Sequence, residues 1–404
     1  MDARKEIGQR IARARRRRGL SQTVLSGLVG RSESWLSQVE RGQRAVDNHT
    51  VINALAQVLG LAVDELTAKK SNTMTRYQAA SAIRQAMMSY DGLSSLIDPR
   101  HAEGSVESFV WLRHEIARVN GLYQAARYDE VGRRLPGLIV ATELGSRYAP
   151  AARRRTYQTL RSLTYHSTTT TLQRVGDPEL AWVAADRSLA AAQEAGRPLL
   201  AAVSAYRLGY VLVRLRETHQ ALRVVLQAAD ALQRSVRRPT SRMLPVIGGL
   251  YLGAVTAAAA AYDHSAVRDF LAQARHIADA LGEDRNDFWT AFGMTNVTIH
   301  EVSAAVEFGD ARGAIGKGES LNLGELAPGL VGRRAQVHLD LARAYALQRK
   351  DAASVNMLLD AERLSPELVR YGEHPRELLT QLLKREHRAS TPQLRELAHR
   401  AGIV

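Results

Sequence analysis

The chain has 404 residues and a formal net charge of +14, with 55 Lys and Arg against 41 Asp and Glu. It contains no cysteine, which excludes disulfide scaffolds, thiol catalysis and cysteine-ligated zinc. Hydrophobic residues make up 45% of it, enough for a large core, and no uncharged apolar run reaches the ~20 residues that a membrane helix needs.

The positive charge is concentrated at the start of the chain. Residues 1–70 carry 13 basic and 7 acidic side chains, whereas residues 71–404 carry 42 and 34. A compact basic module on a nearly balanced body favours binding to a polyanion, although an arginine-rich soluble surface would give the same count. The charged segment Met1–Gln9 is not followed by an apolar stretch, so we expect no signal peptide and a cytoplasmic protein.

Five short helices are predicted before residue 68, and together they form a helix-turn-helix pattern. Ser21 and Ser32 stand at expected N-caps, and Gly19, Gly30 and Gly42 stand at expected helix ends. Residues 29–31 form the tight turn between the second and third helices. In chain order, the predicted helices are one marked by Ile7, Ile11 and Ala14, one from 22 to 28 or 29, one over 33–41, one over 50–59 and a last turn over 63–66.

This segment resembles the Cro-repressor-like (XRE) DNA-binding domain over about residues 6–67. We therefore expect residues 1–68 to bind double-stranded DNA. The matching positions are Gly19-Leu20-Ser21-Gln22, Leu25, Gly30, Ser32, Leu36, Val39-Glu40-Arg41-Gly42, Leu55-Ala56, Leu59-Gly60 and Asp64-Glu65-Leu66.

The resemblance implies that the helix after the turn lies in the major groove and reads bases. Glutamine can bond adenine through two hydrogen bonds, and glutamate can accept one from the cytosine amino group. Ser32 is explained more readily as a cap than as a base contact, and Leu36 and Val39 as core. Trp35 is left open between contact with DNA and packing on a neighbouring helix. The implied base-reading residues are Glu33, Ser34, Ser37 and Gln38.

The resemblance also implies which residues contact phosphates and which pair inside the domain. Gln22 matches a family position that bonds a phosphate, and Arg15 matches the arginine that pairs with the residue numbered Glu40 here. Basic side chains also suit a helix C-terminus, so the run Arg15–Arg18 has a structural explanation beside its nucleic-acid one. The remaining candidates for phosphate contacts are Arg17, Arg18, Arg41 and Arg44.

After a polar linker at 69–75, residues 76–404 are predicted to form an α-solenoid of tetratricopeptide (TPR)-like helix hairpins, which makes the whole fold all-α. Helical segments rich in Ala, Leu and Arg are separated by turns such as Gly176-Asp177-Pro178 and Gly309-Asp310, at a spacing that predicts hairpins of about 34–40 residues. The most apolar stretch, 246–262, is mainly alanine and predicts a tightly packed helix. The best repeat runs through Leu341, Ala342, Tyr345, Leu358, Ala361 and Pro366, with departures at His338 and Ser354.

Three segments of the body resemble actinobacterial regulators in which an XRE domain is joined to a TPR-like sensory or dimerisation domain. This wider resemblance implies transcriptional regulation and supplies no effector. The segments are Asp177-Pro178-Glu179-Leu180-Ala181-Trp182, 292–297 with His300-Glu301-Val302, and 339–345.

The body carries no enzyme signature, and we expect neither a cofactor nor a metal. His114-Glu115 and His300-Glu301 each begin like the HExxH motif of zinc proteases, but positions 118 and 304 are Arg and Ala. Phosphate-binding loops, dinucleotide fingerprints and Ser/His/Asp arrangements do not stand out either.

Two groups of side chains are candidates for an effector pocket. Asn296 and His300 share a helix face near Trp289 and Phe292, and polar groups beside aromatics can orient a small ligand. The alternative for that group is a buried Asn–His hydrogen bond that locks neighbouring hairpins. A Tyr–Arg face makes up the other group, which can equally be solvated surface; it consists of Tyr206, Tyr210 and Arg214.

These features predict a sequence-specific DNA-binding transcriptional regulator that is not an enzyme. A single small head covers too little DNA for operator affinity, so we expect a homodimer on an inverted repeat. In the favoured hypothesis the body dimerises and binds a peptide or small-molecule effector. In the alternative, the regulator is constitutive and the body only dimerises or binds another protein. No membrane partner is expected.

Overall fold

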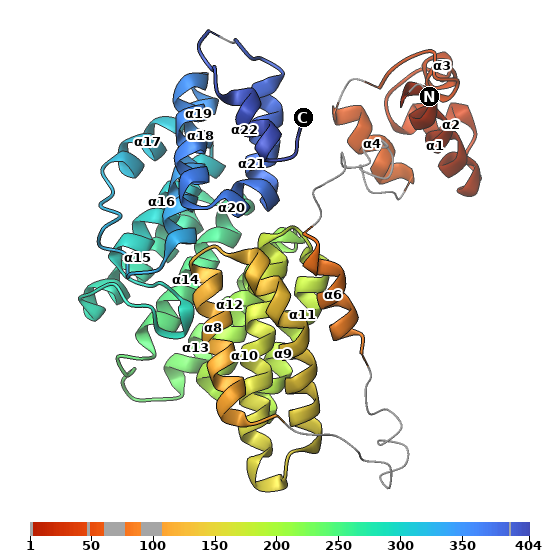
Figure 1. The fold of residues 1–404 in the computed structure, drawn as a ribbon. Coiled ribbons are helices and arrows are strands. Elements are labelled where there is room, and N and C mark those ends of the chain that lie inside the picture. Colours follow the sequence, from red (N-terminus) through yellow and green to blue (C-terminus); the bar gives the residue numbers. More distant parts are fainter. Residues whose placement is uncertain (1–2, 47–48, 60–76, 90–106, 388) are drawn as a thin grey trace, which may run out of the picture. The chain divides into compact units, whose positions relative to one another are not determined.

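The computed structural model describes residues 3–46, 49–59, 77–89, 107–387 and 389–404 (Figure 1). The chain divides into two compact units, Met1–Met74 and Thr75–Val404. In the described residues, helices are joined by turns, and the one strand-like pairing is an isolated bridge between Arg285 and Phe292. The predicted all-α fold is confirmed.

Four helices form the described part of the N-terminal unit. The hydroxyl oxygens of Ser21 and Ser32 accept hydrogen bonds at 3.1 and 3.2 Å from the main-chain N–H three residues on, as N-caps do. The predicted helix ends at Gly19, Gly30 and Gly42 have left-handed φ angles of 65°, 66° and 73°. The predicted turn at 63–66 and the linker at 69–75 lie outside the described residues. The helices are α1 (Ala3–Arg17), α2 (Gln22–Leu28), α3 (Glu33–Glu40) and α4 (His49–Leu59).

A small apolar core holds α3 against the other helices of this unit. Leu25, Leu36 and Leu55 are fully buried in it. Helix α1 crosses α3 so closely that a Cβ atom at Gly8 would lie 2.1 Å from the carbonyl oxygen of Val39. A side chain does not fit at that distance, so glycine is what lets α1 pack there and support α3.

Six helix hairpins follow one another in the second unit, preceded by α6 (Ala79–Met87) and followed by α20 (Pro366–Tyr371), α21 (Glu373–Leu383) and α22 (Leu394–Arg400). Figure 1 shows them in chain order from orange to blue. The hairpins are α8 (Phe109–Gln124) with α9 (Tyr128–Tyr148), α10 (Arg154–Arg174) with α11 (Pro178–Glu194), α12 (Pro198–Arg214) with α13 (Thr218–Arg234), α14 (Leu244–Ala260) with α15 (His264–Leu281), α16 (Met294–Glu307) with α17 (Ala311–Glu319), and α18 (Val331–Leu347) with α19 (Asp351–Leu364).

Most hairpins have about the predicted length, but they follow one another at a longer interval than the sequence predicts. In each one, the turn between the two helices contains a residue with left-handed φ, and successive turn residues lie 40 to 50 positions apart. The predicted period of about 34–40 residues was therefore too short, because segments such as 235–243 and 282–293 join one hairpin to the next. The turn residues are Ala126, Gly176, Arg216, Tyr262, Gly309 and Arg349.

Small residues allow close packing within the hairpins, as predicted. A Cβ atom at Gly209 in α12 would lie 2.4 Å from Val225 Cγ1 in α13. Ser354 stands where the repeat usually has alanine, and its buried hydroxyl donates to the Ala342 carbonyl at 2.8 Å. The alanine-rich helix α14 is buried along most of its length. None of the described helices is both long and apolar enough to cross a membrane.

The hairpin array curves until its end meets its beginning. Helices α8, α10, α12, α14, α16 and α18 each contact the next, and α18 also contacts α8. Arg174 Nη1 in α10 donates to Gln336 Oε1 in α18 at 3.1 Å, and the Tyr371 hydroxyl in α20 donates to Asp129 Oδ1 in α9 at 2.8 Å. Because repeats in an open solenoid touch only their neighbours, these contacts close the array. The first helices of the hairpins thereby line a common interior.

Candidate nucleic-acid interface and effector site

Some side chains of α3 are buried in the core, and others lie at the surface. Leu36 and Val39 are buried, whereas Glu33 and Ser34 are exposed and Ser37 and Gln38 are partly exposed. The four residues implied to read bases thus lie on the part of α3 that the core leaves accessible. Trp35 packs against the core, with the Arg31 guanidinium 5.8 Å from its ring centre.

An ion pair ties α3 to α1. Arg15 Nε donates to Glu40 Oε1 at 2.6 Å and Arg15 Nη2 to Glu40 Oε2 at 2.9 Å, while Arg15 Nη1 donates to the Leu20 carbonyl at 2.8 Å. Hydrogen bonding to Glu40 raises the pKa of Arg15 against the effect of burial. The structure brings together the two residues that the resemblance pairs, and the pairing fixes where α3 begins and ends relative to α1.

Gln22, implied as a phosphate contact, also belongs to this network. Its side-chain Nε2 donates to Glu40 Oε2 at 2.6 Å. An amide nitrogen carries two hydrogens, so one remains for a phosphate oxygen. Glu33 is held as well, because the Thr23 hydroxyl donates to its Oε2 at 2.8 Å. Both side chains are oriented by α2 and α3 before any DNA is bound.

The basic side chains differ in how far the domain restrains them. Arg18 Nη1 donates to the Val58 carbonyl at 2.8 Å, and Arg41 Nε donates to the Ser37 carbonyl at 3.2 Å, although both side chains are exposed. Arg44 is also exposed. The side chain of Arg17 lies outside the described residues. Three of the four predicted phosphate contacts therefore present charge at the surface of this unit.

In the body, the structure joins the two predicted effector groups. The Tyr210 hydroxyl of α12 lies 2.8 Å from His300 Nε2 of α16, and the Tyr206 and Tyr210 rings pack edge to face at 5.1 Å. His300 Nδ1 lies 2.8 Å from the Asn296 carbonyl, which can only accept, so Nδ1 carries the proton and Nε2 accepts from Tyr210. Burial, together with the charge of Arg333, lowers the pKa of His300 to about 3. The imidazole is therefore neutral.

The buried Asn–His hydrogen bond of the alternative is present, but the Asn296 side chain takes no part in it. His300 bonds the main-chain carbonyl of Asn296, and both polar atoms of the fully buried Asn296 side chain lack a partner. A buried amide without hydrogen bonds is costly. Sequence spacing suggested the contact because positions four apart face one another on a helix, but in this helix the backbone is the acceptor.

The other predicted pocket residues have structural partners. Phe292 fills the space beside Gly248, where a Cβ atom would lie 2.0 Å from its ring. The Trp289 ring lies 5.4 Å from that of His166. Arg214 pairs with Glu373, and its Nη1 lies 3.1 Å from His374 Nε2, so its charge is already neutralised.

Sequence reasoning missed three arginines beside this site, Arg174 in α10, Arg207 in α12 and Arg333 in α18. All three guanidinium charges act on the phenol of Tyr123 in α8. No local motif marks these residues, because each is a single arginine in an arginine-rich chain. Only the closed array brings them together, and we call the three the inner arginine cluster.

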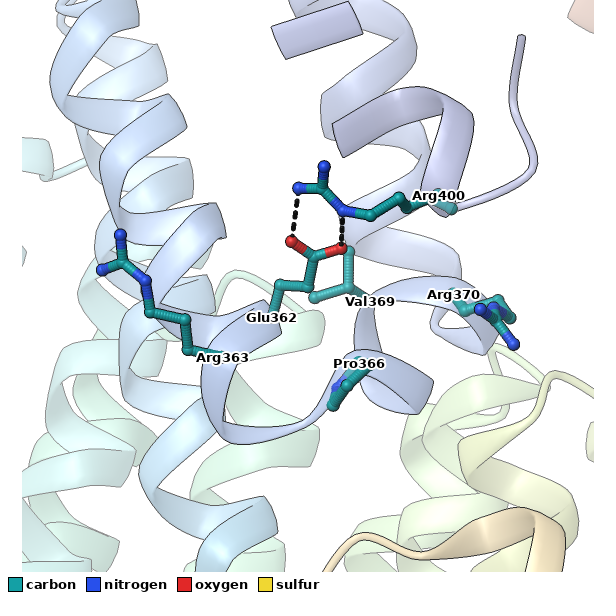
Figure 2. Close-up of a pocket in the computed structure, with 7 residues that line it drawn as sticks. Glu362, Arg363, Pro366, Val369, Arg370 and Arg400 are labelled. Atoms are coloured by element: carbon teal, nitrogen blue, oxygen red, sulfur yellow. Dashed lines mark hydrogen bonds and ion pairs between the residues drawn. The ribbon is translucent and has the colours of Figure 1, made fainter. Parts of the chain in front are cut away.

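Two hollows lie elsewhere on the body, and several of the charges that line them are paired. A surface pocket of about 370 Å³ is lined by α19, α20 and α22, and Figure 2 shows Arg400 reaching across it to Glu362, at 2.8 and 2.7 Å, while Arg363 points the other way. Arg363 pairs with Asp360 at 2.5 Å. A second hollow, of about 440 Å³, includes Arg385, which pairs with Asp351 at 2.8 Å. Among the described residues, no three His, Asp or Glu side chains gather as a metal ion would need.

Comparisons with known proteins identify the N-terminal unit. Residues 6–68 match the model of a helix-turn-helix domain family. A relative from Sinorhizobium fredii, the HTH-type transcriptional regulator y4dJ, is 43% identical over 75 residues, which are 18% of this chain and 94% of the relative. Over 89% of this chain and 99% of the other, the crystal structure of Bacillus thuringiensis PlcR in complex with the peptide PapR7 and DNA aligns with 11% identity and a TM-score of 0.32, too low to transfer any property. By its N-terminal domain, the chain belongs to the HTH-type transcriptional regulators and is a DNA-binding regulator of transcription.

Proposed function

We propose that α3 reads operator bases with Ser34, Ser37, Gln38 and Glu33. The observation that carries this proposal is the bidentate pair between Arg15 and Glu40, which holds α3 while leaving these side chains accessible. Gln38 is the strongest candidate for a specific contact, because a glutamine amide can bond adenine at two atoms. The carboxylate of Glu33 already accepts a hydrogen bond from the Thr23 hydroxyl, and in this proposal it also accepts one from a cytosine amino group. In this proposal the protein binds its operator in the cytoplasm.

The backbone contacts in this proposal come from Gln22 and from Arg17, Arg18, Arg41 and Arg44. Contacts to phosphate set register and affinity but carry no sequence information. Their effect should therefore weaken as salt rises, by the same amount on every DNA sequence. Because a single module of this size buries only about 600–1,000 Å² on DNA, we also propose that two copies bind an inverted repeat as a homodimer.

A selection from pooled oligonucleotides with the purified full chain tests the base-reading assignment. We expect an enriched palindromic motif, and we expect Gln38→Ala to change the preferred base at one position of each half-site. Arg41→Ala is the matched control, since it should weaken all sequences alike and flatten the salt dependence. If no motif is enriched, or if Gln38→Ala leaves the motif and affinity unchanged, the assignment is wrong. Light scattering of the protein–DNA complex tests the two-to-one stoichiometry.

We also propose that the body binds an effector that changes DNA affinity. Support comes from the interior, where the Tyr210–His300 pair lies beside charged and unpaired polar groups. The alternative, a body that only dimerises or binds another protein, is favoured by large apolar side chains left exposed, such as Trp111 and Trp182. If ligands that stabilise the protein never change its affinity for the operator, that alternative is supported.

A further inference from the structure

The inner arginine cluster lies on one wall of the closed array's interior. Arg174, Arg207 and Arg333 come from three different hairpins, and their charges meet at the phenol of Tyr123. Each of these four side chains keeps part of its surface accessible to solvent. The cluster is therefore not wholly sealed from solvent.

None of the three arginines has a carboxylate partner. Arg174 donates to the neutral amide oxygen of Gln336 at 3.1 Å. Arg207 donates to the Trp289 carbonyl at 2.8 Å and lies 4.7 Å over the Tyr206 ring, while its buried Nε has no partner. The guanidinium of Arg333 makes no ion pair or hydrogen bond with any described residue, and only its main-chain N–H donates, to the Leu330 carbonyl.

Several other half-buried arginines of the body are neutralised by a carboxylate, unlike the three of the cluster. Arg161 pairs with Glu143 at 2.9 Å and Arg134 pairs with Glu115 at 2.6 Å. Asp340 is a carboxyl that acts on Arg174, and its two oxygens already accept from Ser303 and Gln336. One carboxyl with its oxygens engaged does not balance three guanidinium charges.

The positive charge of the cluster shifts the pKa values of neighbouring titratable groups. Burial alone would raise the pKa of Tyr123, but the three arginines hold it below its usual value. Burial and Arg207 lower the pKa of His166, as burial and Arg333 do for His300. Tyr123 and the two histidines are thus driven toward their less positive forms, and a region of this kind attracts anions.

We propose that the inner arginine cluster binds a small organic anion through its carboxylate or phosphate oxygens. This inference rests on the proposed effector role of the body and names the class of the effector. Guanidinium groups are suited to the task, since their paired N–H donors match two oxygens of one carboxylate or phosphate. The anion supplies the counter-charge that the chain itself lacks at this point, so its binding also favours the folded array.

The test uses thermal unfolding and calorimetry of the full chain in a phosphate-free buffer. The probes are inorganic phosphate, pyrophosphate, succinate and citrate, each compared with chloride at equal ionic strength. We expect at least one of them to raise the Tm saturably, and the phosphate and carboxylate arms show which chemistry is preferred. Arg333→Gln should weaken that binding by about tenfold or more, as loss of a charge-assisted hydrogen bond does. Arg363→Gln, which removes an arginine paired with Asp360 on the surface, should leave it unchanged.

The Tm of the ligand-free variant distinguishes a folding defect from a loss of anion binding. Removing an uncompensated charge should leave the Tm of ligand-free Arg333→Gln at or above that of the parent. The inference is overturned if no probe stabilises the parent more than chloride, or if the two variants respond alike. An anion that binds through the cluster without changing operator affinity would overturn the effector role but not the anion site. If operator affinity responds to an uncharged ligand and no anion binds, the anion site is overturned but the effector role is not.

Discussion

Replacing Arg15 with alanine should destabilise the N-terminal domain and displace its recognition helix. The side chains of Arg15 and Glu40 are only 11% and 6% exposed, and the substitution deletes both hydrogen bonds between them. Removing one partner of a buried pair costs about 3–5 kcal/mol, and we expect about 3 here because Gln22 still donates to Glu40. The charge left on Glu40, rather than the lost contact itself, accounts for most of that cost.

Hydrogen exchange of the full chain measures this locally. A loss of about 3 kcal/mol should speed exchange in peptides from α2 and α3 by about 100-fold, since each 1.4 kcal/mol is a factor of ten. Peptides from α14 should not change, and Arg44→Ala is the matched control, because that exposed arginine should affect DNA binding without affecting exchange. The double variant Arg15→Met/Glu40→Leu should recover most of the loss. An Arg15→Ala variant that exchanges within about threefold of the parent would refute the reasoning.

Four further predictions follow from single positions. Gly8→Ala should cost about 2 kcal/mol or more and abolish operator binding in a mobility-shift assay, because its Cβ would lie 2.1 Å from a carbonyl oxygen of α3. Arg216→Gly should raise the free energy of unfolding, measured by denaturant titration, by about 0.5–1 kcal/mol, as it relieves a left-handed φ of 66° on an exposed residue, whereas Gly176→Ala, at φ 85°, should lower it. Asn296→Leu should stabilise the body by about 1 kcal/mol in the same assay, since it removes a fully buried amide without partners; a loss of stability would show that this amide is satisfied. Because the pKa of His300 is about 3 in the folded chain, below about pH 6.5 the unfolded chain binds a proton that the folded chain does not, so stability should fall by up to about 1.4 kcal/mol per pH unit as the pH drops toward 4, and His300→Gln should flatten that slope.

Much of the DNA-binding domain could be predicted, because its signals act over a few residues. A serine cap, a glycine at a left-handed helix end and apolar residues at helical spacing each work through the nearest turn of backbone, and all of them appear where the sequence places them. The contact between Arg15 and Glu40 followed from a resemblance rather than from local rules. The close approach of α1 to α3 at Gly8 had no such signal, because a glycine inside a helix does not reveal what it packs against.

The hairpin period was underestimated for a related reason. Gly176 and Gly309 mark two of the turns in the sequence, but Ala126, Arg216 and Arg349 adopt the same left-handed conformation without a glycine. Such a residue is strained by itself and is held in place by the helices packed on both sides. A pattern that relies on turn chemistry therefore misses it.

The concentration of charge at the start of the chain, the helix-turn-helix pattern and the all-α body were determined by the sequence alone, since each depends on composition or on neighbours along the chain. Only the tertiary structure decided that the array closes, and with it that Tyr210 meets His300 and that three arginines gather around Tyr123. These residues lie on helices far apart in sequence. Their meeting depends on the small rotation between successive hairpins, which accumulates over the whole array and which no single hairpin encodes.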